Sequence, residues 1–202
     1  MADSTIRPFR SEDTDACYAI CLRTGDLGRD ATHLFSDPRL LGEIYVGPYL
    51  ARWPGFAFVV EDELGVAGYI VGAPDTVEHE RWLEAEWWPA LRDRYPRTSF
   101  RDEPAAARCV AHVHAPPVTD SEITAGYPAH LHIDLLARSQ GRGYGRRLTD
   151  RLLEALAAAG VPAVHLACSP DNTAAIAFYR RLGFEDLRDR PWVGRPTASM
   201  ET

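Results

Sequence analysis

The sequence lacks a long apolar run, a surplus of positive charge and an N-terminal export signal. A membrane-spanning helix needs about 18 or more consecutive apolar residues, and no segment approaches that length. The net charge is −7, whereas nucleic-acid binding requires a basic surface. Residues 1–4 show neither the basic nor the apolar region of a signal peptide. We therefore expect a cytoplasmic protein that binds neither nucleic acids nor membranes.

Metal-ligand spacing is also missing. The 4 cysteines form no C-x-x-C pair, and no group of histidines completes a zinc site along the sequence. We therefore expect reduced thiols and no metal. Cys17 and Cys21 share one face of an expected helix, and we interpret them as core residues because free cysteine is usually buried.

The composition fits one folded domain. The 202 residues are 46% hydrophobic and 25% charged, which is ordinary for a globular protein. No internal repeat or low-complexity tract divides the chain. We expect a single domain over residues 1–202, with a helical insertion at about 75–128.

Hydrophobic periodicity and turn residues predict the order of strands and helices. Strands are expected at Thr5–Phe9, Phe56–Glu61, Val66–Gly72, Ala129–Leu136, Ala163–Cys168 and Phe184–Leu187, with one more near Thr197–Met200. Helices are expected from Ser11 to Gly25, from about Pro38 to Arg52, at Glu103–Val113, at Tyr144–Ala159 and from Asn172 to Gly183. The early hairpin should be antiparallel and the late β-α-β unit parallel, with a right-handed crossover. The fold class is therefore α/β, with a mixed central sheet flanked by helices on both faces.

A glycine-rich turn, Gln140 to Gly145, lies between an expected strand and an expected helix. Glycines allow a close approach of the backbone to a ligand, and the first amides of a helix are unpaired. Such a corner binds anions, pyrophosphate above all. The spacing is Q-x-x-G-x-G rather than the dinucleotide fingerprint G-x-G-x-x-G, which indicates coenzyme A instead of NAD. Four arginines around the turn strengthen the case for an anionic ligand, namely Arg138, Arg142, Arg146 and Arg147.

This turn, the strand before it and the segment Asn172 to Phe184 together resemble the GNAT superfamily of N-acetyltransferases. The last segment looks like the family's N-x-x-A-x-x-F-Y-x-x-x-G-F signature. The resemblance is strong over residues 129–187 and reasonable over 1–72. Motifs such as Ile6-Arg7-Pro8 and Glu86-Trp87-Trp88-Pro89 are similar to the acetyltransferase-like C-terminal domain of O-GlcNAcase and its stand-alone bacterial relatives. The resemblance implies the GNAT (acyl-CoA N-acyltransferase) fold.

The resemblance also implies acetyl-CoA as co-substrate. The amides of residues 141–146 would take the pyrophosphate, and the strand edge at Ile133, Leu135 and Ala137 would pair with the pantetheine arm. An amide near Leu135 or Leu136 would polarise the thioester carbonyl. The cofactor-binding residues expected in this way are Ile133, Leu135, Leu136, Ala137, Gln140, Gly141, Arg142, Gly143, Tyr144, Gly145, Arg146, Asn172, Phe178 and Tyr179.

By the same resemblance, Tyr179 would be the general acid for the departing thiolate. The alternative is a core tyrosine on the apolar stripe of its helix. Asn172 is either a residue near the cofactor or simply a helix cap. The general base is less defined, because Leu131 and Ala129 occupy the positions where family members often carry Glu or His.

The polar residues of this strand, His130, His132 and Asp134, alternate onto the other face. A bulge could rotate them inward. Asp134 is the first candidate for the base and His132 the second. The alternatives are that these side chains satisfy backbone groups, or that the base is relayed by water or supplied by the substrate.

The tryptophan-rich insertion is the expected substrate-selecting element. Trp82 or Trp87 could wall an acceptor pocket, whereas Trp88, Leu91 and Tyr95 have the spacing of a core stripe. Four glutamates offer negative charge to a cationic acceptor or form a solvated face, namely Glu78, Glu80, Glu84 and Glu86.

The sequence therefore predicts an enzyme that moves acetyl from acetyl-CoA to a primary amine by direct attack in a ternary complex. The acceptor would be a small molecule or a peptide, and the protein a monomer or homodimer. A different class of function stays open, a catalytically weak acetyl-CoA-binding module for interaction or regulation, because the usual carboxylate positions are apolar. A nicotinamide-dependent oxidoreductase is disfavoured by the spacing of the glycine turn.

Overall fold

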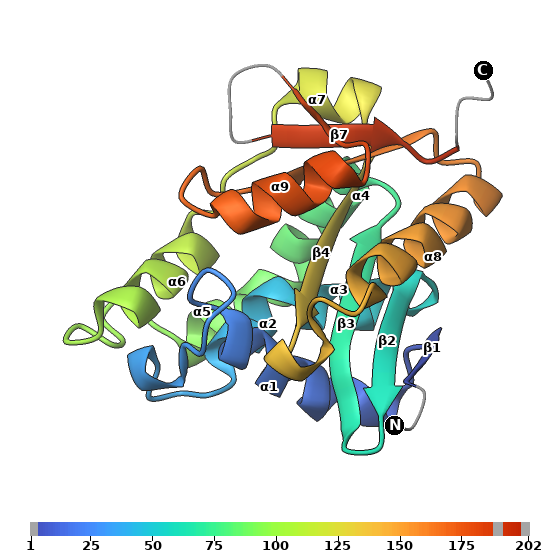
Figure 1. Ribbon diagram of the computed structural model, residues 1–202. Coiled ribbons are helices and arrows are strands. Elements are labelled where there is room, and N and C mark those ends of the chain that lie inside the picture. The colour runs from blue at the N-terminus through green and yellow to red at the C-terminus, as the bar shows by residue number, and fades with distance from the viewer. Residues whose placement is uncertain (1–3, 188–191, 199–202) are drawn as a thin grey trace.

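The computed structural model describes residues 4–187 and 192–198, and a seven-stranded mixed sheet forms its centre (Figure 1). The strand order is β1-β2-β3-β4-β5-β7-β6. The strands are β1 (Thr5–Pro8), β2 (Ala57–Asp62), β3 (Gly65–Ala73), β4 (Ala129–Leu135), β5 (Ala163–Ala167), β6 (Glu185–Asp186) and β7 (Trp192–Pro196). The fold class expected from the sequence is confirmed.

The helices also follow the expected order. They are α1 (Thr14–Thr24), α2 (Leu40–Tyr45), α3 (Gly47–Arg52), α4 (Thr76–Trp82), α5 (Trp88–Arg94), α6 (Pro104–His114), α7 (Ser121–Gly126), α8 (Tyr144–Ala158) and α9 (Thr173–Arg181). A π-helical segment, Leu83–Trp87, joins α4 to α5.

Three details of the sequence-based assignment are wrong. The expected helix from Pro38 to Arg52 is two helices, because the chain leaves helical geometry at Val46 before α3 begins at Gly47, with Pro48 in its first turn. Helix α7 lies between two segments expected to be loop, Pro116-Pro117 and Gly126-Tyr127-Pro128, and it includes Gly126 as its last residue. The last strand runs over Trp192–Pro196 rather than near Thr197, and Met200 lies outside the described residues.

The strand pairings agree with the expected topology. Strands β2 and β3 form the antiparallel hairpin, and β4 pairs with β5 in parallel across helix α8. One irregularity shifts the register between Val60 and Glu61, so that Ala67 of β3 has no partner on β2. Strand β4 pairs with β3 in unbroken register from His130 to Leu135, so the bulge considered for β4 is not there.

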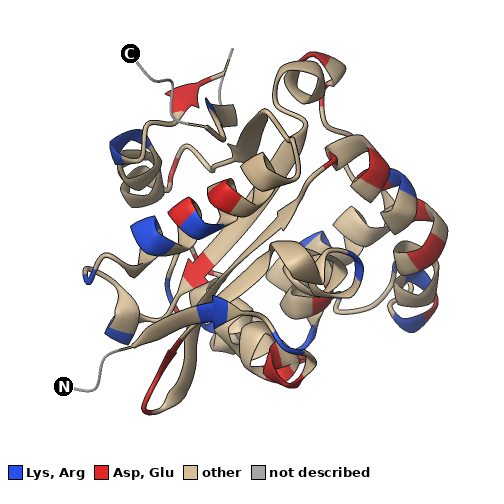
Figure 2. Ribbon diagram, turned by 90° about the vertical axis from the view of Figure 1, so that its right-hand side faces the viewer, with Lys and Arg blue, Asp and Glu red and all other residues tan. Residues whose placement is uncertain are grey.

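Helices cover both faces of the sheet, each over its own apolar cluster (Figure 2). On one face, α1, α2 and the insertion pack against alternate residues of β2 and β3, among them Val59 and Tyr69. On the other face, α8 and α9 pack against the intervening residues, among them Val60 and Ile70. The two faces of β4 consequently meet different surroundings.

The insertion, residues 75–128, is anchored by its expected core stripe. Trp88, Leu91 and Tyr95 are all buried, as their spacing predicted. The indole N–H of Trp87 donates to the Glu43 carbonyl at 2.8 Å. These contacts fix the insertion against α2 on the face opposite α8.

Strands β4 and β5 separate soon after they begin. Their pairing covers only Ala129 with Val164 and His130 with His165. Beyond His130, β4 continues to Leu135 beside β3 alone within the described part of the chain. Because the two strands diverge, the main-chain edge of β4 beyond His130 is left unpaired on the side that faces β5.

None of the helices in the described part of the chain combines the length and the apolar character needed to cross a membrane.

Candidate active site

The glycine turn has the geometry of an open main-chain corner. Gly141 and Gly143 have φ angles of 69° and 80°, in the left-handed region that favours glycine. A Cβ atom at either position would meet nothing within 4 Å. These glycines are thus required by the backbone conformation, and the space beside them is free.

The amides of this turn have no competing acceptors. Within residues 4–187 and 192–198, no backbone or side-chain acceptor is bonded to the N–H groups of residues 141–146. The first backbone hydrogen bond of the helix is donated by Arg147 N to Gly143 O, at 3.1 Å. Successive free amides at a helix N-terminus, with the helix dipole behind them, form a binding site for an anion.

The exposed edge of β4 continues from this turn. Leu136 N donates to Ala67 O of β3 at 2.9 Å. Because the amides of a strand point alternately to its two sides, those of Leu135 and Ile133 point away from β3, toward the gap before β5. The Leu135 carbonyl already accepts from Nε2 of Gln140 at 2.8 Å.

Two expectations for this edge need correction. The amide of Leu136 is not free for a ligand, because it is bonded to β3, so of the two candidate amides only that of Leu135 faces the gap. Ala137 does not continue the strand: it begins a 3₁₀ turn, Ala137–Ser139, and its carbonyl accepts from Gln140 N.

The four arginines of this region differ in their contacts and in their exposure to solvent. Arg138 donates to Asp62 at 2.7 Å and to the Val66 carbonyl, which ties the 3₁₀ turn to the hairpin. This guanidinium lowers the pKa of the Asp62 carboxyl. Arg147 lies over the ring of Tyr144. Arg142, Arg146 and Arg147 are all exposed, so positive charge remains available around the turn.

Helix α9 packs against the start of α8. A Cβ on Gly145 would approach the Phe178 ring to 2.9 Å, so only glycine allows this contact. The Arg146 guanidinium donates to the Arg181 carbonyl at 3.2 Å. Phe178 and Gly145, both expected near the cofactor, are thus in contact with each other.

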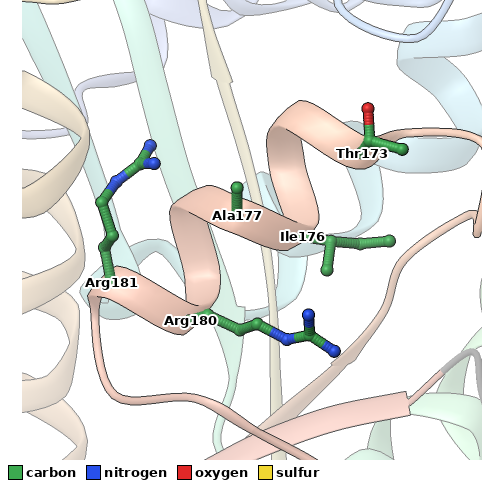
Figure 3. A pocket seen from close by; sticks show the side chains of 5 residues that line it. All are labelled: Thr173, Ile176, Ala177, Arg180 and Arg181. Carbon is green, nitrogen blue, oxygen red and sulfur yellow. The ribbon is translucent and has the colours of Figure 1, made fainter.

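A cavity of about 430 Å³ lies along α9 (Figure 3). Its lining residues repeat at helical spacing and include two arginines whose side chains extend from the helix, the full set being Thr173, Ile176, Ala177, Arg180 and Arg181. Arg180 is paired with Asp186 at 2.7 Å. The sequence analysis did not single out this face, although the i, i+3, i+4, i+7 spacing was visible.

Tyr179 is 7% exposed and contacts the rings of Phe178 and Phe184. Its hydroxyl has no hydrogen-bond partner among the described residues, yet no sealed side-chain N or O atom there lacks a partner. The hydroxyl must therefore reach accessible space. Burial raises the pKa of Tyr179, and the charges of Cys168 and Asp134 add to the shift, so the phenol is protonated at neutral pH.

Asn172 caps helix α9. Its side-chain oxygen accepts from Ala175 N at 3.1 Å, which is the cap geometry considered from the sequence.

Asp134 is the centre of a side-chain cluster on the opposite face of β4. Its Oδ2 accepts from the Tyr69 hydroxyl at 2.6 Å and lies 3.0 Å from Nε2 of His132. Cys21 of α1 approaches the same group. The side chains of His132 and Asp134 are 33% and 17% exposed, so solvent reaches the cluster.

His130 lies apart from this cluster. Its Nδ1 is 2.8 Å from the Thr76 hydroxyl, and burial holds its pKa well below the ordinary value. The structure therefore brings His132 and Asp134 together. His130 instead contacts Thr76 of the insertion.

Aromatic rings lie beside His132, and a separate aromatic pair lies within the insertion. Tyr45 stacks near the His132 ring at 6.2 Å between centroids, and Trp82 and Trp87 contact each other at 5.7 Å. Sequence reasoning missed Tyr45, Tyr69 and Cys21, because they belong to α2, β3 and α1. The only indication of these residues in the sequence was the periodicity that places each of them on one face of its helix or strand.

The insertion's glutamates are mostly engaged. Glu78 pairs with Arg52 at 2.6 Å, and Glu84 pairs with Arg92 at the same distance. Glu80 accepts from the backbone and hydroxyl of Thr119. Glu80 and Glu84 thus join parts of the insertion, and Glu78 joins it to α3.

The chain is also similar to known proteins. The model of the acetyltransferase (GNAT) family matches residues 26–184. The crystal structure of SsHAT is 40% identical, with a TM-score of 0.89, and the match covers 98% of this chain and 100% of that chain. A structure of agmatine N-acetyltransferase, 17% identical over 96% of this chain and 99% of that chain, with a TM-score of 0.57, shares the fold.

A curated relative, protein O-GlcNAcase of Rattus norvegicus, is 26% identical over 181 residues. The match covers 89% of this chain but 20% of the relative, so the chain spans about a fifth of that protein's length.

Proposed function

Because the chain belongs to the acetyltransferase (GNAT) family, we propose that it transfers acetyl from acetyl-CoA to a primary amine, as one domain and by direct attack in a ternary complex. The observation that carries the proposal is the row of unpaired amides at residues 141–146, which adjoins the exposed edge of β4. An anion site next to an unpaired strand edge suits a ligand with a pyrophosphate and an amide-containing arm.

The donors of the turn fit the pyrophosphate. The N–H groups of residues 141–146 have no protein acceptor among the described residues, and the space beside Gly141 and Gly143 is free. Arg142 and Arg146 add positive charge nearby. The cavity on α9 extends this region with Arg181, whose backbone is bonded to Arg146. We assign the nucleotide end of the co-substrate to this side of the site.

The pantetheine arm would lie along β4 in the gap before β5. The free main-chain groups there are those of Ile133 and the amide of Leu135. The Leu135 amide is the donor we assign to the thioester carbonyl, where it would stabilise the negative charge that develops on the oxygen.

Asp134, paired with His132, is the proposed acceptor of the amine proton. The two groups share one hydrogen bond, are reached by solvent and lie on the α1–α2 face. Tyr69 is a positioning residue, since its hydroxyl holds Oδ2 of Asp134. The amine would therefore approach from the face opposite α8.

Tyr179 is the proposed proton donor to the departing thiolate. Its hydroxyl has no hydrogen-bond partner among the described residues and reaches accessible space, so it is available to donate. A phenol that stays protonated at neutral pH is in the correct state to donate.

The test is direct. Calorimetry with acetyl-CoA measures binding, and release of the CoA thiol across a panel of small amines, polyamines and peptides measures turnover. The chain contains no lysine, so its own side chains offer no ε-amine to consume acetyl groups. Binding with amine-dependent release supports the enzyme. Binding without release for any acceptor would favour the binding module, and absence of binding would refute both.

A further inference from the structure

Three potential metal ligands meet beside the proposed base. One ligand atom each from Cys21, His132 and Asp134 lies within 4.8 Å of the other two. Cys21 comes from α1 and the other two from β4. Because Cys21 is far in sequence from His132 and Asp134, no metal-ligand motif in the sequence indicates the cluster.

The donors suit a borderline-soft cation. A sulfur, an imidazole nitrogen and a carboxylate oxygen are the ligands that Zn²⁺ takes in proteins, whereas Mg²⁺ and Ca²⁺ prefer oxygen alone. Zn²⁺ binds sulfur at about 2.3 Å and nitrogen or oxygen at about 2.0–2.2 Å. Tetrahedral ligands are then about 3.3–3.8 Å apart, so small side-chain shifts convert the present cluster into a coordination shell.

We propose that Cys21, His132 and Asp134 bind Zn²⁺, and that the bound ion stops acetyl transfer. The inhibition rests on the proposed function, because His132 and Asp134 are the groups assigned to proton removal. Binding converts the Cys21 thiol to a thiolate and releases its proton to solvent. The metal then coordinates the lone pairs of His132 and Asp134 that would otherwise accept the amine proton.

The surroundings of the cluster support this assignment. His132 and Asp134 are partly exposed and give the ion an entry from the acceptor side, whereas Cys21 is 3% exposed and closes the inner end. The Tyr69 hydroxyl donates to Asp134, which is the outer-shell contact that orients a ligating carboxylate. Three protein ligands leave a fourth position for water.

Cobalt substitution tests the site without reference to activity. Co²⁺ titrated into the reduced, EDTA-treated protein should give thiolate-to-metal charge-transfer absorption and saturate at one ion per chain, and Zn²⁺ should displace it. Cys21→Ser should lose this absorption. Cys17→Ser is the matched control, because Cys17 is a buried thiol one turn earlier on the same helix and outside the cluster.

Thermal melts confirm that both variants are folded. If Cys21→Ser does not fold, His132→Gln takes its place and should weaken Co²⁺ binding at least tenfold. No thiolate absorption in the wild type, or equal absorption in Cys21→Ser, would overturn the site.

Inhibition is measured against each variant's own rate in EDTA. Acetylated product is quantified by chromatography, since Zn²⁺ binds the released thiol. Zn²⁺ should suppress the wild type and Cys17→Ser at least tenfold, reversibly with EDTA, and Cys21→Ser should need at least tenfold more Zn²⁺. Equal sensitivity of all three proteins would refute inhibition through this site. A protein without turnover in EDTA refutes the proposed function, while the cobalt spectrum still decides the metal site.

Discussion

The cofactor side and the acceptor side of the candidate site are built from different parts of the chain. On the cofactor side, residues 141–146 present main-chain amides from one continuous segment. On the acceptor side, Tyr69, His132 and Asp134 present side chains from two strands, joined by Cys21 from a helix. Strand β4 separates the two sides, with its apolar residues toward α8 and its polar residues toward α1.

The difference teaches how each side should respond to change. A main-chain site tolerates side-chain substitution unless the new group enters the ligand's space or distorts φ. A side-chain cluster depends on individual atoms and on the packing that holds them. Variants on the cofactor side should therefore alter the affinity for acetyl-CoA, and variants on the acceptor side should alter the rate of acetyl transfer.

The largest effect is expected at Asp134. Asp134→Asn removes the proposed proton acceptor but keeps the size of the side chain. Positioned general bases contribute about 10²–10⁴ in rate, and we expect kcat/KM for the amine to fall by about 10³. Affinity for acetyl-CoA, measured by calorimetry, should stay within about threefold, because the pyrophosphate site lies on the other side of β4. A rate near wild type would remove Asp134 from the mechanism.

The next effect is expected at Gly143. Gly143→Asp places a carboxylate among the free amides, and acetyl-CoA affinity should fall at least about 100-fold, or about 2.7 kcal/mol. Gly143→Asn is the matched control, because asparagine tolerates the same left-handed φ without a charge. The asparagine variant should lose much less affinity. Equal losses would show that backbone strain, rather than charge, explains the effect.

Tyr179 belongs to the apolar cluster on the α8–α9 face of the sheet. Tyr179→Phe should lower kcat by about 10- to 100-fold through loss of the proton donor, with little change in acetyl-CoA affinity. Loss of stability alone, seen as a lower melting temperature with an unchanged kcat, would identify Tyr179 as a core residue.

The smallest effect, spread over a pH range, is expected from His79 on the acceptor side. Burial lowers the pKa of His79 to about 4, and its Nδ1 accepts from the Trp53 indole at 3.0 Å. Since the folded pKa lies below the unfolded value of about 6.5, the unfolded state binds more protons. The stability is therefore complete above about pH 6.5 and is lost as pH falls toward 4.

Urea unfolding between pH 7.5 and pH 5 measures this dependence. His79→Gln, which cannot titrate, should reduce the slope by about 1.4 kcal/mol per pH unit below pH 6. An unchanged slope would assign the acid sensitivity to other buried histidines, such as His130, whose pKa is also lowered by burial.

Much of the fold was predictable because its signals are local. Gly25, Gly160 and Gly183 follow the ends of α1, α8 and α9. The turn between two apolar runs identified β2 and β3. The boundaries that failed depend on tertiary contacts. The break at Val46 lets α2 pack against α1 and α6 while α3 packs against β3. The two-residue strand β6 exists only because β7 pairs with it.

The sequence alone determined the glycine turn, since left-handed glycines and unpaired helix amides follow from a few neighbouring residues. It also determined the two faces of β4 through the alternation of its side chains. Only the tertiary structure decided which amide of the strand end is free and where β4 parts from β5. It alone brought Tyr69 and Cys21 to Asp134, because contacts between distant elements depend on how the sheet and helices pack, and no local pattern encodes that packing.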